Sequence, residues 1–243
     1  MDPASQSLTA LLRPDGRRAL GQEEAPRTLI ASAYLRLRRD IIEGRHGPGE
    51  KLRVEHLKST YQVSASTLRE ALALLVSDSL VVPQSQRGFR VAPMSLADIE
   101  DLTRTRTLLE CAAVRDSIQF GDDEWEARVV SAYHMLSRAE ERLASDVAAL
   151  FDEWEQRNRE FHEALVSGCP SRWMRQFRTL LYQQSERYRR LSAVKTPVPG
   201  SVHDEHRQIF EAVLARDAER ADAVLGKHIQ FALSVIRDLG LLR

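Results

Sequence analysis

Three histidines and an asparagine in the C-terminal half of the chain have residue types and spacing that suit a metal ion. Asn158 precedes His162 by four residues, which places both side chains on one face of a helix. His206 and His228 stand on two later helical segments, each one turn from apolar residues. Neutral imidazoles with one oxygen ligand favour a borderline divalent cation such as zinc. Spacing alone leaves a second interpretation open, in which each histidine is a core residue with ordinary hydrogen bonds.

Hydroxyl and guanidinium groups gather at the start of a short helix nearer the N-terminus. Such groups at the N-terminal end of a recognition helix can reach base edges and phosphates in the major groove of DNA. A polar turn with arginine and glycine follows and has the composition of a DNA-contacting wing. The candidate DNA-binding residues are Ser64, Ser66, Thr67, Arg69, Arg87 and Gly88.

The segment that carries these residues, 51–93, predicts a winged helix-turn-helix. Apolar residues repeat at helical spacing on both sides of a turn at 62–64, and Ser64 or Ser66 can cap the second helix, expected over about 66–77. After this helix the pattern changes to two short strands around a polar turn. An ordinary αα-hairpin with an attached strand pair is the alternative, because that arrangement is common.

Charge is unevenly distributed along a chain whose formal net charge is zero. Residues 25–93 hold 11 lysines and arginines against 6 aspartates and glutamates, and the remainder has the opposite excess. A basic N-terminal part on an otherwise acidic protein suits phosphate contact at one end only. The charge pattern therefore favours DNA binding over a plain αα-hairpin.

The rest of the chain has the pattern of an all-α antiparallel helical bundle. A first helix over about 26–43 leads into the helix-turn-helix, and no convincing strand follows residue 93. The expected bundle helices are 96–119, 123–143, 146–167, 171–192, 201–215 and 217–238. The predicted fold is therefore mainly α, with a mobile tail at 1–24, a DNA-binding domain at 25–93 and a helical domain at 94–243.

Length and composition exclude several classes of protein. The 243 residues suffice for two domains, no apolar run approaches the ~20 residues of a membrane span, and the N-terminus lacks the apolar stretch of a secretory signal. Cys111 and Cys169 lie far apart without a metal-binding spacing, which suits reduced thiols. We therefore expect a cytoplasmic protein without a membrane partner.

Three short motifs resemble the GntR family of bacterial transcription regulators: PGEKL, LREAL at 68–72 and the wing RGFRVAP. By position, the matches to family residues that contact operator DNA are Ser64, Ser66, Thr67, Arg69 and Gly88. Many relatives have arginine at the position of Ala65, where it reads a guanine. The resemblance therefore implies a different operator base at that point, or a larger share of the readout for Arg69.

Residues 96–243 resemble the all-α effector domain of the FadR branch of that family, called the FCD domain. The resemblance implies that the asparagine and the three histidines bind one metal ion, with Asn158 where many relatives have aspartate. It also implies that Arg106, four residues before Glu110, meets a carboxylate of the bound ligand. A metal ion and a guanidinium would then hold one carboxylate together.

The segments GDDEWEA at 121–127 and DEWEQRNREFHEALVSGC at 152–169 are similar to the carbon-starvation-induced regulators, which govern catabolism of glutarate, 2-hydroxyglutarate and γ-aminobutyrate. The implied function is a homodimeric repressor of a catabolic operon, released from a palindromic double-stranded operator by a small carboxylate. A C5 dicarboxylate such as glutarate or 2-hydroxyglutarate is the implied effector. Arg187, Tyr188 and Arg189 are candidate second clamps for it, with a solvated basic face as the alternative for each.

A metal-dependent hydrolase or hydratase on a helical bundle, with an accessory DNA-binding domain, is the rival class. His162 and Glu163 begin like the zinc motif HExxH, but Val166 stands where the second histidine is needed. No phosphate-binding loop or nucleophile elbow occurs. A structural DNA-binding protein without a ligand would leave the inward polar residues of the bundle unexplained. We therefore expect a regulator with no catalytic residues.

Overall fold

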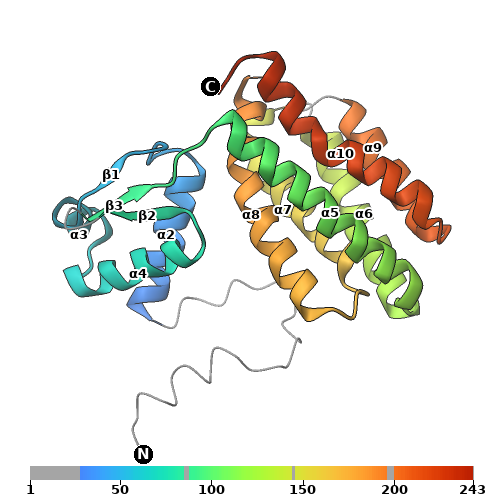
Figure 1. The fold of residues 1–243 in the computed structure, drawn as a ribbon, viewed down its shortest axis with the longest axis horizontal. Coiled ribbons are helices and arrows are strands. Elements are labelled where there is room, and N and C mark those ends of the chain that lie inside the picture. Colours follow the sequence, from blue (N-terminus) through green and yellow to red (C-terminus); the bar gives the residue numbers. More distant parts are fainter. Residues whose placement is uncertain (1–27, 85–87, 144–145, 196–199, 243) are drawn as a thin grey trace, which may run out of the picture.

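The computed structural model describes residues 28–84, 88–143, 146–195 and 200–242. Figure 1 shows two parts, a small N-terminal domain with a sheet and a larger bundle of helices. The predicted tail at 1–24 and the wing residue Arg87 lie outside the described residues. No helix in the described ranges is long and apolar enough to cross a membrane.

The N-terminal domain packs three helices against a small antiparallel sheet. The helices are α2 (Leu29–Ile42), α3 (Val54–Tyr61) and α4 (Ala65–Ser77), and the strands are β1 (Lys51–Leu52), β2 (Val81–Gln84) and β3 (Gly88–Val91). Leu37, Leu68 and Leu72 are fully buried at the centre of its core. The turn between α3 and α4 uses Gln62 in the left-handed region at φ +54°, which ends α3 and redirects the chain.

The sheet has three described strands, in the order β1-β3-β2, where the sequence predicted two. Lys51 and Leu52 pair with Arg90 and Phe89 of β3, and α3 begins only after Arg53. Two residues are too few to show the alternation of a strand, so the sequence pattern assigned them to the following helix. The extra strand fastens the wing to the loop before α3.

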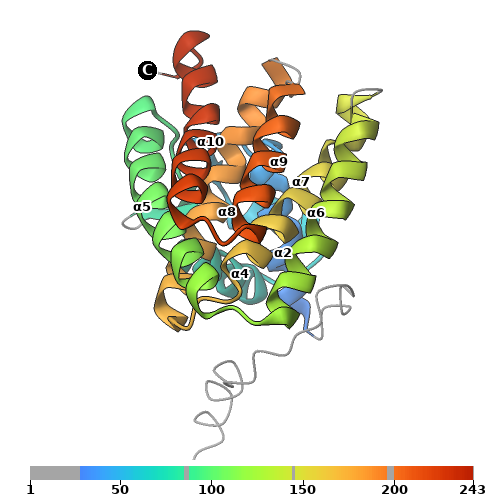
Figure 2. The same ribbon diagram turned by 90° about the vertical axis from the view of Figure 1, so that its right-hand side faces the viewer.

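Six helices of the described ranges form the C-terminal bundle, seen along its side in Figure 2. They are α5 (Leu96–Phe120), α6 (Asp123–Leu143), α7 (Val147–Val166), α8 (Arg172–Lys195), α9 (Gly200–Leu214) and α10 (Ala218–Asp238). Ser95, Asp146 and Asp217 cap helix starts by accepting hydrogen bonds from backbone N–H groups. The mainly α fold with an antiparallel bundle, predicted from sequence, is confirmed.

Helix α8 of the bundle packs against the N-terminal domain (Figure 1). Gln184 donates to the carbonyl of Asp78, just after α4. Arg187 donates to the carbonyl of Ala92 at 2.7 Å, between β3 and α5. Arg38 of α2 lies 4.0 Å from Glu186. Contacts with α2, with the end of α4 and with the segment that joins the domains therefore converge on one turn of α8.

Candidate metal centre and nucleic-acid interface

The three histidines named from sequence meet inside the bundle. His162 of α7, His206 of α9 and His228 of α10 each offer a ring nitrogen, and these nitrogens lie within 4.8 Å of one another. The ring centroids of His206 and His228 are 4.5 Å apart, and those of His162 and His228 are 5.3 Å apart. His162 is 1% exposed to solvent and His206 is 0% exposed. Helices from three places in the sequence thus present one compact set of imidazoles.

A carboxylate lies behind each histidine. Nδ1 of His206 is 2.6 Å from Glu140, and Nδ1 of His228 is 2.9 Å from Glu205. Nδ1 of His162 is 3.5 Å from Glu110. An ionised carboxylate only accepts hydrogen bonds, so Nδ1 of His206 and Nδ1 of His228 carry the proton, and their Nε2 atoms have free lone pairs. This carboxylate–histidine pairing is typical of metal-binding imidazoles.

Burial keeps His162 and His228 neutral, and hydrogen bonds and nearby charges keep the neighbouring carboxylates ionised. Burial lowers the pKa of His162 well below its usual value, and burial with the nearby His206 lowers the pKa of His228 to about 4. Burial alone would raise the pKa of Glu140, but hydrogen bonding and attraction to His206 outweigh it, so that pKa is lowered. Neutral imidazoles backed by ionised carboxylates are the protonation states that a metal ion requires.

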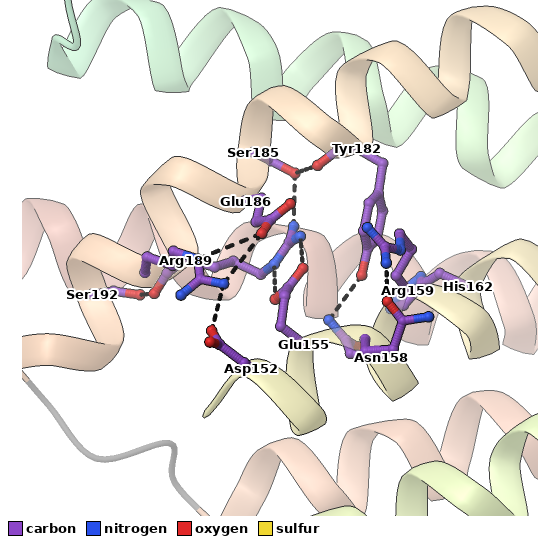
Figure 3. A network of polar contacts seen from close by, with 12 residues as sticks. Asp152, Glu155, Asn158, Arg159, His162, Tyr182, Ser185, Glu186, Arg189 and Ser192 are labelled. Atoms are coloured by element: carbon purple, nitrogen blue, oxygen red, sulfur yellow. Dashed lines mark hydrogen bonds and ion pairs between the residues drawn. The ribbon is translucent and has the colours of Figure 1, made fainter. Parts of the chain in front are cut away.

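Several polar atoms here are buried and have no partner in the described chain. They are Oδ1 of Asn158, both ring nitrogens of His162 and Nε2 of His206. The amide nitrogen of Asn158 donates to the hydroxyl of Tyr182 at 2.9 Å, which leaves its oxygen free (Figure 3). Unpaired buried polar atoms are costly, and a divalent cation would pair with the amide oxygen of Asn158 and with one ring nitrogen of each histidine. The donor set therefore fits the metal ion that the family resemblance implies.

A cavity of about 60 Å³ adjoins the cluster, and Asn158, His162 and His228 contribute to its wall. Arg106 lines the same cavity, 5% exposed. Its guanidinium donates to Glu110 at 2.8 Å and to the hydroxyl of Ser185 at 3.0 Å. The position predicted to meet a ligand carboxylate is thus beside the histidines and faces the cavity.

Glu110 links the arginine to the histidine cluster. It accepts from Arg106 and, at 3.1 Å, from Arg178, and it lies behind His162. Burial would raise the pKa of Glu110, but the two guanidinium groups reverse this and hold its pKa well below the usual value. Glu110 therefore stays ionised in a fully buried position.

The structure separates the three candidates for a second clamp. Tyr188 lines the cavity and its hydroxyl donates to Asp98. Arg189 also lines the cavity, donating to Glu155 at 3.0 Å and to Ser185 at 2.7 Å (Figure 3). Arg187 is not part of the cavity wall and contacts the domain joint instead. Arg187 and Tyr188 are only 6% and 2% exposed, so neither belongs to a solvated basic face.

Sequence reasoning missed the carboxylates that orient the histidines. Glu205 is adjacent to His206, and its place one residue before a candidate ligand was an available signal. Glu140 lies in RAEERL between Leu136 and Leu143 at helical spacing, so its position favours the buried face over that of Glu141, but no motif marks it as a histidine partner. The packing of α6 against α9 pairs it with His206.

The predicted DNA-binding residues surround the start of α4. Ser64 caps the helix by accepting from the N–H of Thr67 at 3.1 Å, and its hydroxyl lies 2.9 Å from that of Ser66. Ser64, Ser66 and Arg69 are exposed, on the side of α4 away from its buried leucines. Gly88 opens β3 at φ +93°, a backbone conformation that favours glycine. The hydroxyls of Ser64, Ser66 and Thr67 thus form one hydrogen-bonded group at the start of α4, and Arg69 is exposed one turn further along.

Comparisons with known proteins agree with this architecture. Residues 29–91 match the bacterial regulatory proteins of the gntR family, and residues 101–231 match the FCD domain. The chain belongs to the GntR family. Its C-terminal part is an FCD domain, as the sequence motifs indicated.

Two curated relatives cover most of this GntR protein. BphR of Paraburkholderia xenovorans (strain LB400), an HTH-type transcriptional regulator, is 54% identical over 89% of this chain and 89% of its own. GlaR of Escherichia coli (strain K12), an HTH-type transcriptional repressor, is 38% identical over 84% of this chain and 94% of its own. A GntR regulator from Rhodococcus sp. RHA1 has a similar structure, with TM-score 0.69, 26% identity and coverage of 88% and 99%. Both matched families and these relatives are transcription regulators, so the protein is a DNA-binding regulator and not an enzyme.

Proposed function

We propose that this GntR protein is a homodimeric repressor of a catabolic operon, released from a palindromic operator when its bundle binds a small carboxylate. The observation that carries the proposal is the set of unpaired metal-donor atoms beside Arg106 at the wall of one cavity. The name of GlaR, a repressor 38% identical to this chain, supports repression as the direction of control. Such a regulator acts on the chromosome, in the bacterial cytoplasm.

Asn158, His162, His206 and His228 would hold a divalent metal ion, for which zinc suits the nitrogen-rich donor set. When bound, the metal ion offers a Lewis-acidic position for one carboxylate oxygen. Arg106 donates hydrogen bonds to the same carboxylate, and Glu110 keeps the guanidinium in place. Asn158 in place of an aspartate makes the site one negative charge weaker. The C5 dicarboxylates implied by the sequence resemblance are one candidate class of ligand.

DNA binding would use two copies of α4 related by a two-fold axis. Ser64, Ser66, Thr67 and Arg69 would enter the major groove, while the wing at Gly88 and Arg87 would contact the backbone. A two-fold protein reads a palindrome, because each domain meets an equivalent half-site.

Helix α8 supplies the connection from the cavity to the DNA-binding domain. Ser185, Tyr188 and Arg189 line the cavity, while Gln184 and Arg187 of the same turns contact the N-terminal domain and the joint. A ligand that favours one position of α8 would shift the spacing of the two α4 helices. This requires different ligand affinities for the two arrangements.

The test uses the purified full-length chain and an operator selected from random duplex DNA. Fluorescence anisotropy measures operator affinity with zinc or chelator present, and with or without a panel of small acids. We expect at least one acid to weaken operator binding at least tenfold in the zinc-loaded protein and to leave the Arg106→Gln variant bound. The proposal fails if no acid alters operator affinity, or if release is equal with and without the Arg106 guanidinium.

A further inference from the structure

The wall of the cavity changes from polar to apolar along the bundle axis. On α5 it runs from Arg106 back to Ile99, and on α7 from His162 back to Trp154. On α10 it runs forward from His228 to Val235. Because α5 and α7 run antiparallel to α10, all three gradients point the same way, toward the end where α5 begins and α10 ends (Figure 1).

The length of this wall limits the length of a ligand that can lie along it. The first and last wall residues on each of these helices are seven or eight positions apart, which is about 10–12 Å at 1.5 Å per residue. The apolar part of the wall is formed by aromatic and branched side chains, namely Ile99, Trp154, Val202, Ile229, Phe231 and Val235, with Ala193 and Ala232. A volume of 60 Å³ corresponds to roughly four to six water molecules. An acid of five to eight carbons is of suitable size.

The two cationic side chains of the wall converge on one point. Arg106 and Arg189 both donate to the hydroxyl of Ser185, at 3.0 and 2.7 Å. Both also stack on the ring of Tyr182, with guanidinium carbons 4.6 and 4.3 Å from its centroid. Their positive charges therefore lie close together. Tyr188 and Ser192 add hydroxyl groups further along the wall, and these two arginines are its only permanently charged side chains in the described chain.

The two arginines of the wall are already paired with buried carboxylates, Arg106 with Glu110 and Arg189 with Glu155. A ligand carboxylate at the polar end would gain hydrogen bonds from these guanidinium groups. A second carboxylate at the other end would be a buried charge among apolar side chains, which is strongly unfavourable.

We propose that the effector is a monocarboxylate with an apolar body, aromatic or branched and about one helical heptad long, rather than a dicarboxylate. Its carboxylate lies at the polar end with Arg106, and its body fills the end formed by Trp154 and Val235. The indole N–H of Trp154 is buried without an acceptor in the described chain, so a hydroxyl or keto oxygen on the body would gain a hydrogen bond. This inference rests on the proposed carboxylate site and names the class of acid that it binds.

The test compares acids that differ only in the second carboxylate. Pentanoate is paired with glutarate, and benzoate with terephthalate, and each is titrated into the zinc-loaded full-length protein by calorimetry and thermal unfolding. We expect the better monoacid to bind at least tenfold more tightly than its diacid partner and to give the larger rise in Tm. Equal or tighter binding of the diacids would overturn the inference and leave the proposed function intact.

A charge introduced at the apolar end provides the second measurement. Val235→Lys places a cation where the second carboxylate of terephthalate would lie, and should shift the terephthalate-to-benzoate affinity ratio at least tenfold toward the diacid. Ser234→Lys, the same charge change on the exposed side of α10, should leave the ratio unchanged. An unchanged ratio in Val235→Lys would mean that the ligand body lies elsewhere.

Outcomes with DNA separate this inference from the proposed function. If a monoacid binds but operator affinity does not change, the ligand class stands and regulation by it is wrong. If none of the four acids binds, both the ligand class and the carboxylate site are wrong.

Discussion

A few buried side chains with unequal roles determine what this GntR protein can bind. Glu140 and Glu205 fix the tautomers of His206 and His228 through hydrogen bonds, so each of these imidazoles presents the lone pair of its Nε2. Glu140 also contacts a second histidine, because Nδ1 of His203 lies 2.7 Å from its other carboxylate oxygen. Residues that touch no ligand thus prepare the ones that do.

Glu140→Gln should therefore weaken metal binding. The substitution preserves side-chain size but removes the charge that orients His206, and we expect a 10–100-fold loss of zinc affinity, measured by competition with a chelating dye. Glu141→Gln, at the adjacent exposed position, is the matched control and should bind zinc like the parent. Unchanged affinity in Glu140→Gln would exclude His206 as a metal ligand.

Arg69→Ala should weaken operator binding by about 1–3 kcal/mol, because an exposed arginine near the start of α4 can make two hydrogen bonds to a guanine. Binding of acids and zinc should be unaffected. Arg128→Ala, which removes an exposed arginine of the bundle, serves as the control in the same anisotropy assay. If Arg69→Ala binds the operator as tightly as the parent protein, Arg69 does not take part in base recognition.

At the scale of elements, two glycines allow the α5–α6 turn and the end of α7 to pack closely together. A Cβ on Gly121 would lie 2.3 Å from the ring of Trp125 and 2.5 Å from the carbonyl of Ser117. A Cβ on Gly168, after α7, would approach Gly121 at 3.1 Å. The α5–α6 turn and the end of α7 therefore pack backbone against backbone, which fixes the level of Asn158 and His162 relative to Arg106.

Gly121→Ala should destabilise the bundle by about 1–3 kcal/mol, since the added methyl group must displace a buried indole or a backbone carbonyl. Urea denaturation followed by tryptophan fluorescence measures the change. Gly47→Ala in the N-terminal domain has open space and should change stability little. Equal midpoints for the two variants would show that the turn accommodates a side chain.

For the whole molecule, function depends on how α8 joins the cavity to the DNA-binding domain. Its cavity-facing residues alternate along the helix with residues that contact Asp78, Ala92 and Arg38. A small movement of this helix would therefore change both the cavity and the contacts with the DNA-binding domain.

Gln184→Ala should reduce the coupling between acid and operator without abolishing either binding event. Removing the hydrogen bond to Asp78 should lower the acid-induced change in operator affinity at least threefold, within the usual range of coupling energies. Gln183→Ala, at the neighbouring half-buried position, is the control. Full coupling in Gln184→Ala would exclude this contact from signal transmission.

The sequence by itself determined the features that depend on nearby residues. Helix caps, apolar periodicity and turn residues act over about four positions, so the helix-turn-helix, the bundle helices and the Asn158–His162 pair could be predicted from local patterns. Family motifs added the GntR and FCD assignments. The two-residue strand β1 was not predicted, because its pairing with β3 is a contact between residues far apart in the sequence.

Only the tertiary structure decided which residues share a site. Arg187, Tyr188 and Arg189 are consecutive on one helix, yet two line the cavity and one contacts the domain joint, because successive side chains point about 100° apart. The pairing of Glu140 with His206 and the convergence of Arg106 and Arg189 on Ser185 likewise depend on how the helices pack. No local pattern encodes the apolar end of the cavity, because its wall comes from five helices.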